Sequence, residues 1–261
     1  MKKFITLLAI TSLFIGCEID EDLNDDPNAF TDSPIGLIIN HALLNVAAVA
    51  EAAPARIASM YTDQLTGYDR QYATWNIYSV NTSSYNETWS DGLSAGAAQA
   101  QVAKAKAVEA GNAQIQGIAE ILEGYYFAET ALVFGDIPFS EANKLDFPDP
   151  VYEPQATVIN GAIALIQSGI QKAGSVSAAN NVFSTSSTWS QVGNALLARY
   201  NLAMGNNSAA LAAAKAANFT STDNDWDIIH TTTNYMENLF WMFEIEERQD
   251  YLRVQNSYMS D

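Results

Sequence analysis

Cysteine, histidine and basic residues are scarce in this chain, and each scarcity excludes a class of function. The single cysteine, Cys17, allows no intramolecular disulfide and no metal site built from several cysteines. The two histidines, His41 and His230, lie far apart, so we expect no metal site and no cofactor. Only 12 Lys and Arg stand against 30 Asp and Glu, and a net charge of −18 argues against binding to nucleic acid.

The N-terminus has the pattern of an exported lipoprotein. A basic start, Met1–Lys3, is followed by an apolar run, Phe4–Ile15, and then by Gly16 and Cys17. This order is typical of a secretory signal, and the apolar run is too short to span a bilayer. Phe14–Cys17 resembles a bacterial lipobox. We therefore predict a signal peptide at residues 1–16 and a lipid anchor on Cys17 that holds the protein at a membrane; the alternative is a chance cysteine in a cleaved leader.

An acidic stretch, Glu18–Asp22, follows the predicted lipidation site. It resembles the export signal that sends lipoproteins of Bacteroidetes-type bacteria to the cell surface. We interpret residues 17–33 as an acidic tether, and we expect the protein to be anchored in the outer membrane and to face the cell exterior. The alternative is that the stretch is simply a solvated linker.

The remaining residues, 34–261, are predicted to form one helical domain. Alanine is frequent and proline is scarce, with 7 in the chain, which favours helices that pack closely. Apolar residues recur at helical spacing between interruptions rich in Gly, Pro, Asn and Ser. This pattern predicts helices over 34–53, 55–65, 84–110, 113–134, 153–173, 187–204 and 207–217.

The last predicted helix pair indicates how the helices pack. Small residues fall at the positions where a tetratricopeptide repeat needs them for close helix contact: Ala198, Gly205, Ala210, Ala214 and Ala217. Together with the earlier alanine-rich helices, they predict an all-α fold, an irregular tetratricopeptide-like stack of helix pairs with long loops.

Residues 66–89 differ from the rest because they are rich in aromatic residues and follow no period. We predict a loop that carries the ligand. Sugar rings have apolar faces that pack on indole and phenol rings, so Trp75, with Tyr72 and Tyr78, is the predicted platform. Nearby side chains that could hydrogen-bond to hydroxyl groups are Arg70, Gln71 and Asn76. The alternative is that these aromatic residues only cover the helices beneath them.

The other aromatic residues are interpreted as structural. Tyr85 and Trp89 are expected at the packed start of a helix. We expect the remainder to lie in the core or at a seam with a further domain: Trp189, Tyr235, Phe240, Trp241 and Phe243.

Four segments, in order, resemble the SusD/RagB family of nutrient-binding outer-membrane lipoproteins. Asp22–Asn28 resembles the family's opening after the lipid anchor, and Phe134–Ala142 resembles its "yGDiPyseA" segment after a long aromatic helix. Tyr152–Gln155 resembles its "YD-x-Q" helix start, and Asn194–Arg199 its "N-x-L-x-x-R" helix. Family members are about twice as long as this chain, so we expect that the family's C-terminal half is missing here.

The resemblance implies a binding protein that lies like a lid over a TonB-dependent, SusC-like transporter. It implies capture of oligosaccharides, or in some members peptides, for import. The repeat surface would dock on the transporter, and the ligand would lie against exposed aromatic residues.

Two alternatives are kept open. The first is an envelope adaptor of the tetratricopeptide type that binds only proteins. The second is a helical glycoside hydrolase, because Glu120, Glu123 and Glu129 lie on one predicted helix and paired carboxylates serve glycosidases as acid and base. The sequence has no phosphate loop or dinucleotide fingerprint, and neither histidine is placed to serve a serine nucleophile, so we predict that the protein is not an enzyme.

Overall fold

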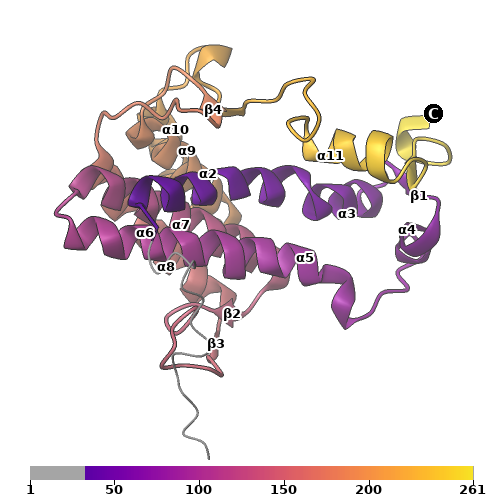
Figure 1. The fold of residues 1–261 in the computed structure, drawn as a ribbon, viewed down its shortest axis with the longest axis horizontal. Helices are drawn as coiled ribbons and strands as arrows, with labels where there is room; N and C mark the ends of the chain where they lie inside the picture. Colours follow the sequence, from indigo (N-terminus) through magenta and orange to yellow (C-terminus); the bar gives the residue numbers. More distant parts are fainter. Residues whose placement is uncertain (1–32, 261) are drawn as a thin grey trace, which may run out of the picture. The chain divides into compact units, whose positions relative to one another are not determined.

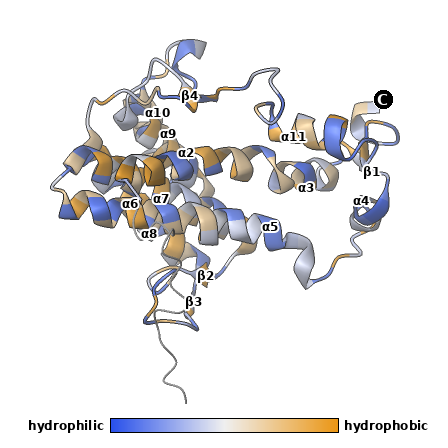
Figure 2. Ribbon diagram, in the orientation of Figure 1, coloured by the Kyte–Doolittle hydropathy of each residue, from blue (hydrophilic) through white to orange (hydrophobic). Residues whose placement is uncertain are grey.

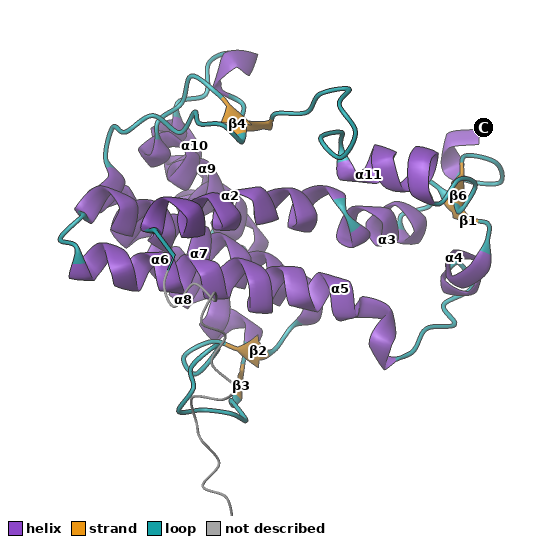
Figure 3. Cartoon of the chain, in the orientation of Figure 1, coloured by secondary structure: helices purple, strands orange, loops and turns teal. Residues whose placement is uncertain are grey.

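A computed structural model describes residues 33–260 of the chain (Figure 1). The predicted signal peptide, Cys17 and the tether up to residue 32 lie outside the described residues. Within the described part, helices account for most of the chain and the strands are short, paired segments (Figure 3). The α-helices are α2 (Ile35–Glu51), α3 (Ala53–Tyr61), α4 (Arg70–Trp75), α5 (Asn86–Trp89), α6 (Ala98–Glu109), α7 (Ala113–Phe134), α8 (Gln155–Ala173), α9 (Trp189–Ala203), α10 (Asn207–Ala217) and α11 (Leu239–Trp241).

Shorter or wider helical turns and three strand pairs complete the secondary structure. The 3-10 and π turns are η3 (Thr82–Tyr85), η4 (Ser90–Ala97), η5 (Thr222–Asn224), η6 (Met242–Glu247) and η7 (Tyr258–Ser260). The strands are β1 (Thr66–Gly67), β2 (Ile137–Pro138), β3 (Tyr152–Glu153), β4 (Phe183–Ser184), β5 (Asp227–Ile228) and β6 (Leu252–Arg253). They pair antiparallel as β1 with β6, β2 with β3, and β4 with β5.

The predicted fold class, mainly helical, is confirmed. Helices α7 and α10 have the predicted bounds, and the others differ at their ends by a few residues. The helix predicted over 84–110 is a continuous helical run from η3 to α6 that passes through the π turn of η4. The prediction that 66–89 is a loop is wrong in part, because this segment contains β1, α4 and η3.

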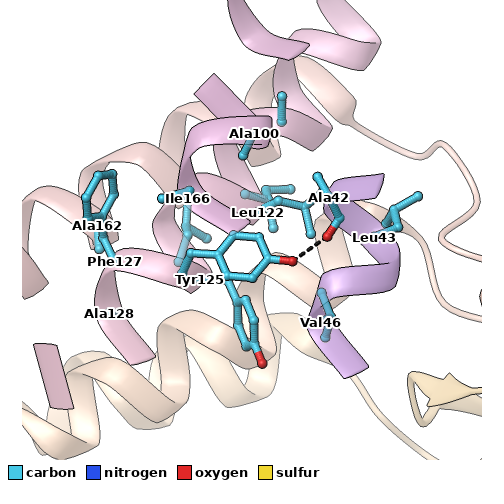
Figure 4. Close-up of a cluster of buried hydrophobic side chains, with 14 of the residues drawn as sticks. Ala42, Leu43, Val46, Ala100, Leu122, Tyr125, Phe127, Ala128, Ala162 and Ile166 are labelled. Atoms are coloured by element: carbon cyan, nitrogen blue, oxygen red, sulfur yellow. Dashed lines mark hydrogen bonds between the residues drawn. The ribbon is translucent and has the colours of Figure 1, made fainter. Parts of the chain in front are cut away.

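Helix α7 is the centre of the core. Asn112 caps its start by accepting a hydrogen bond from the Ile115 amide at 3.1 Å. Residues on all its sides are buried, and it packs against α2, α6, α8 and α9. Apolar residues gather where these helices meet (Figure 2). In Figure 4, Ala42, Leu122 and Ile166 converge from three helices. The hydroxyl of Tyr126 donates a hydrogen bond to the Ala42 carbonyl.

Consecutive helices pack as neighbouring pairs. Helix α6 packs on α7 across the short Ala110–Asn112 turn, and α9 packs on α10 across residues 204–206. Helix α8 packs against both α7 and α9. Helix α6 contributes small buried side chains to these contacts: Ala100, Ala103 and Ala107 have no exposed surface. Small side chains allow close approach of the helices.

Two of the segments that carry the family resemblance are joined in space. Strand β2 pairs with β3, and the Asp136 carboxylate accepts a hydrogen bond from the Gln155 amide at 2.9 Å. The Gln155 side chain in turn donates to the Ala131 carbonyl near the end of α7, at 2.7 Å. Segment 134–142 therefore ends α7, and segment 152–155 starts α8 from the same point.

The stretch Ile35–Tyr61 is long and apolar enough to cross a membrane by length and composition alone. Core helices of globular proteins pass the same test. In the structure this stretch is α2 and α3, and α2 places Ile39, Ala42 and Val46 among the buried residues of the core. We therefore describe it as part of the helical core.

Candidate functional site

The aromatic segment is attached to the C-terminal segment of the described chain. Strand β1 pairs with β6, and the Tyr68 amide donates to the Tyr251 carbonyl at 2.8 Å. Only glycine fits at position 67, because a Cβ there would lie 2.1 Å from the carbonyl oxygen of Tyr72. Segments separated by about 185 residues of sequence thus form one unit, at the end of the molecule where α3, α4, α11 and β1 lie (Figure 1).

This unit has its own apolar core, distinct from the one around α7. We call it the second core; its buried residues are Ala53, Ile57, Met60, Tyr72, Tyr251 and Leu252. Trp75, Tyr85 and Phe243 pack against it from the partly buried layer. An aromatic-rich segment without a regular period is therefore ordered by packing on distant residues.

Tyr72 is a buried support of this unit. Its side chain is 2% exposed, and its ring lies 5.6 Å from that of Phe243 and 5.8 Å from that of Tyr251. Its hydroxyl accepts a hydrogen bond from Nε of the buried Arg56 at 2.8 Å. Burial raises the pKa of Tyr72, with Arg56 opposing the change. Tyr72 thus has no open ring face for a ligand.

Arg56 joins the second core to the helical run that follows. Its guanidinium lies 3.9 Å from the ring centroid of Phe243 and 3.3 Å from the Glu87 carboxylate. A buried arginine needs such partners, because a charge removed from water without them is costly. Arg56 therefore fixes α3, Tyr72 and α5 relative to one another.

Trp75 belongs to a row of four stacked or hydrogen-bonded aromatic side chains. We call Trp75, Tyr85, Tyr61 and Tyr78 the aromatic row. Trp75 stacks with Tyr85 at 6.4 Å between centroids and 25° between planes, and Tyr61 stacks with Tyr78 at 5.2 Å and 28°. The Tyr61 and Tyr85 hydroxyls lie 2.8 Å apart and join the two stacks. Burial and this hydrogen bond raise the pKa of Tyr61 to about 12.

Tyr78 presents the row to solvent. Its side chain is 71% exposed, and its φ of 58° lies in the left-handed region, which bulky residues seldom adopt. Its amide donates to the Trp75 carbonyl at 2.8 Å, which closes the turn after α4. Strained backbone of this kind persists only where the surroundings hold it, and it is concentrated at ligand sites.

The three predicted polar residues lie around α4. Arg70 and Gln71 are exposed in its first turn, which Asp69 caps by accepting a hydrogen bond from the Arg70 amide at 2.9 Å. Asn76 is exposed directly after α4, and its Oδ1 accepts from the Gly67 amide at 3.2 Å. The Nδ2 group of Asn76 can still donate to a ligand.

The structure corrects part of the reading of the other aromatic residues. Trp189 is buried as expected, and Phe240 and Phe243 pack against the second core. Tyr235 and Trp241 are 82% and 46% exposed, so they do not lie in the core; that they lie at a seam with a further domain stays a prediction. Tyr61 was not among the predicted site residues. Its position one turn after Ile57 on an amphipathic helix indicates that its ring packs near the buried face.

The carboxylates of α7 are not arranged as a glycosidase pair. Glu120 contacts Lys172 of α8 at 2.5 Å, and Glu123 contacts Lys104 of α6 at 2.5 Å. Glu129 contacts Arg199 of α9 at 3.0 Å. Each carboxylate therefore joins α7 to a different helix. Within residues 33–260 no group of three or more His, Cys, Asp and Glu could hold a metal ion.

Comparison with known proteins identifies the family to which this fold belongs. A SusD-like family model described as "Starch-binding associating with outer membrane" matches residues 27–260. The chain belongs to this SusD-like family. A crystal structure of a SusD/RagB family protein from Bacteroides thetaiotaomicron is similar to this SusD-like chain, with a TM-score of 0.64 and 20% identity. At that identity the similarity shows the fold.

The match to that structure is partial in length. It covers 80% of this SusD-like chain and 47% of the other, so the chain spans about half the length of that relative. Among curated proteins no match was found.

Proposed function

We propose that this SusD-like protein captures an oligosaccharide, or a peptide as the alternative ligand, at the aromatic row and passes it to a TonB-dependent, SusC-like transporter. The observation that carries the proposal is the row itself, which runs from the half-buried Trp75 to the exposed Tyr78. Stacked aromatic rings offer a large, stiff apolar surface at low entropic cost. Membership of a family described as starch-binding supports a sugar ligand.

Roles within the site follow from exposure. Trp75 and Tyr78 contact the sugar rings, and Arg70, Gln71 and Asn76 hydrogen-bond to hydroxyl groups. Tyr72 acts through Trp75, whose ring lies 4.9 Å from its own. The proposed platform therefore consists of Trp75 and Tyr78, and Tyr72 supports it. The function needs no chemistry, and the proposal includes no turnover.

Binding can be measured by isothermal titration with a panel of neutral oligosaccharides: maltoheptaose, cellohexaose, xylohexaose and mannohexaose. We expect Trp75→Ala and Tyr78→Ala each to weaken binding of the preferred sugar about tenfold, the equivalent of about 1.4 kcal/mol. Phe147→Ala is the matched control, because Phe147 is an exposed aromatic residue in the separate 139–151 connection. Unchanged binding in both row variants would contradict the assignment, and steady release of reducing ends would contradict the absence of turnover.

The anchor and the partner are tested on the native protein. We propose that Cys17 carries the lipid, that the mature protein faces the cell exterior, and that the helix stack docks on the transporter. Purification from outer membranes, with mass spectrometry, is expected to recover a TonB-dependent barrel in near-equal amount. Cys17→Ala is expected to move the protein out of the membrane fraction. Recovery of soluble envelope proteins without a barrel, by a protein that retains no sugar, would favour the adaptor alternative.

A further inference from the structure

A cavity with an exposed indole lies in the C-terminal part of the described chain, apart from the aromatic row. Its volume is about 430 Å³, within the range of about 300–1,000 Å³ for small-molecule sites. The lining residues that matter here are Thr231, Asn234, Glu237, Asn238, Trp241 and Glu246. None of them belongs to the aromatic row.

Glu51 fixes the loop that forms this cavity. One oxygen of its carboxylate lies 2.9 Å from Nε2 of His230, and the other accepts from the Leu239 amide at 3.3 Å. Both ends of the 231–238 loop are therefore attached to the last residue of α2. Within the loop, the Thr231 amide donates to the Met236 carbonyl at 3.0 Å. The cavity is thus built before a ligand arrives.

The Trp241 side chain lines this cavity and is partly exposed there. It is half-exposed, and in the described part of the chain no other aromatic ring stacks on it. Asn238 accepts a hydrogen bond from the Trp241 amide at 3.1 Å and so fixes the start of α11. The π turn η6 begins at the next residue and carries Glu246 to the cavity. Single π turns are frequent at functional sites.

The lining chemistry selects a class of ligand. The cavity offers an indole, hydroxyls, amides and two carboxylates, Glu237 and Glu246, and its lining includes no lysine or arginine. Carboxylates accept hydrogen bonds from sugar hydroxyls, but they repel uronic acids and sulfated sugars. An apolar ring with a few polar groups around it suits a pyranose.

We propose that the Trp241 cavity is a second sugar subsite, specific for a neutral pyranose unit and closed to acidic sugars. The inference rests on the proposed function, because it specifies which sugars the protein takes. Phe240, beside Trp241, and Trp75 both pack against the second core, so one rigid framework carries the two sites.

The test uses ¹⁹F NMR of the full chain labelled with 5-fluorotryptophan. The chain has 5 tryptophans, and replacing Trp75 and Trp241 by Phe, one at a time, assigns their two resonances. The probes are the four neutral oligosaccharides named above and an oligogalacturonate of similar length. We expect the preferred neutral sugar to shift the Trp241 resonance and the oligogalacturonate to leave it unchanged. Trp241→Ala is expected to weaken binding of the neutral sugar about tenfold.

A charge variant tests the stated specificity. In the double variant Glu237→Gln with Glu246→Gln, the repulsion is removed while hydrogen-bonding groups remain, so the oligogalacturonate is expected to shift the Trp241 resonance. Glu109→Gln with Glu141→Gln removes the same charge on other helices and connections and is expected to leave the probe unbound at this site.

The possible outcomes separate this inference from the proposed function. A neutral sugar that shifts Trp75 but never Trp241 overturns the second subsite and leaves the proposed function standing. Binding of oligogalacturonate at Trp241 of the unaltered protein overturns the neutral specificity. No shift of either resonance with any sugar counts against both.

Discussion

Gly117 of α7 and Gly169 of α8 stand against each other where the two helices pack. A Cβ on Gly169 would lie 2.5 Å from the Gly117 carbonyl oxygen, and a Cβ on Gly117 would lie 2.4 Å from the Ala173 amide nitrogen. Atoms cannot approach so closely without moving a helix. The separation of α7 and α8, and with it the position of the whole stack, therefore depends on the absence of two side chains.

Gly169→Ala is expected to lower the free energy of unfolding by about 1–3 kcal/mol, the usual cost of overpacking a core. Gly36→Ala is the control, because a Cβ there would have no atom within 4 Å and Gly36 lies in α2. Alanine forms helix better than glycine by up to about 1 kcal/mol, so this variant is expected to be stabilised. Urea unfolding followed by circular dichroism gives both values. A Gly169→Ala variant as stable as the unaltered protein, or more stable, would show that helix packing does not depend on the contact.

The Glu120–Lys172 pair is expected to make stability depend on pH. Burial favours a higher pKa for Glu120, but hydrogen bonds from Lys172, Ser168 and Gln116 outweigh it and lower the pKa below the ordinary 4.5. A lowered pKa stabilises the fold above the unfolded-state value and ceases to do so as the pH falls through the folded-state value. The contribution is therefore present at neutral pH, begins to decrease below the ordinary value of 4.5 and is lost as the pH falls through the lower folded-state pKa.

Glu120→Gln is thus expected to cost about 1–3 kcal/mol at pH 7 and progressively less as the pH falls below the ordinary value of 4.5, as followed by urea unfolding at each pH. Glu109→Gln removes the same charge at an exposed position near the end of α6 and should cost little at any pH. A loss in Glu120→Gln that did not decrease at any acidic pH at which the protein stays folded would mean that the ion pair is not its cause.

Asp91 has the opposite pH dependence. Burial, with a smaller effect from Glu87, raises its pKa to about 6 from 3.8. A raised pKa stabilises the folded state below the unfolded-state value, and this stability is lost as the pH rises through about 6. Asp91→Asn is therefore expected to raise the melting temperature at pH 7.5 relative to the unaltered protein and to change it little at pH 4.

Asp149→Asn, at an exposed position in the 139–151 connection, makes the same charge change without burial. It serves as the control in the same melting experiment. A gain at pH 7.5 in both variants would point to the net charge of −18, and not to the burial of Asp91, as the source.

Local pattern predicted most of the helical stack. The apolar period and the interrupting residues predicted the observed first and last residues of α7 and α10. Asn112 and Gly205–Asn206 mark the starts of these helices in the sequence itself. The family segments also predicted where α7 ends and α8 starts. Such features depend on neighbours a few residues away, which a sequence displays directly.

The site was harder to predict because it depends on distant residues. The order in 66–89 comes from pairing β1 with β6 and from packing Tyr72 on Phe243 and Tyr251. No local signal shows that Tyr72 is buried while Tyr78 is exposed, since both are tyrosines in one polar segment. The cavity at Trp241 likewise depends on a distant residue. Glu51, at the end of α2, holds the two ends of the 231–238 loop that forms it.

Tyr72 and Tyr78 form a matched pair for separating support from ligand contact. The Tyr72 hydroxyl accepts the buried bond from Arg56, so Tyr72→Phe leaves a buried guanidinium donor without that partner. We expect a loss of about 1–3 kcal/mol in unfolding free energy and little change in sugar affinity at a temperature where the variant is folded. Tyr78→Ala removes an exposed ring, so it should leave the stability within about 0.5 kcal/mol and weaken binding of the preferred sugar about tenfold. Denaturant unfolding and isothermal titration on both variants give the four values. If Tyr72→Phe loses affinity without losing stability, the buried tyrosine contacts the ligand after all, and the division of roles along the aromatic row is wrong.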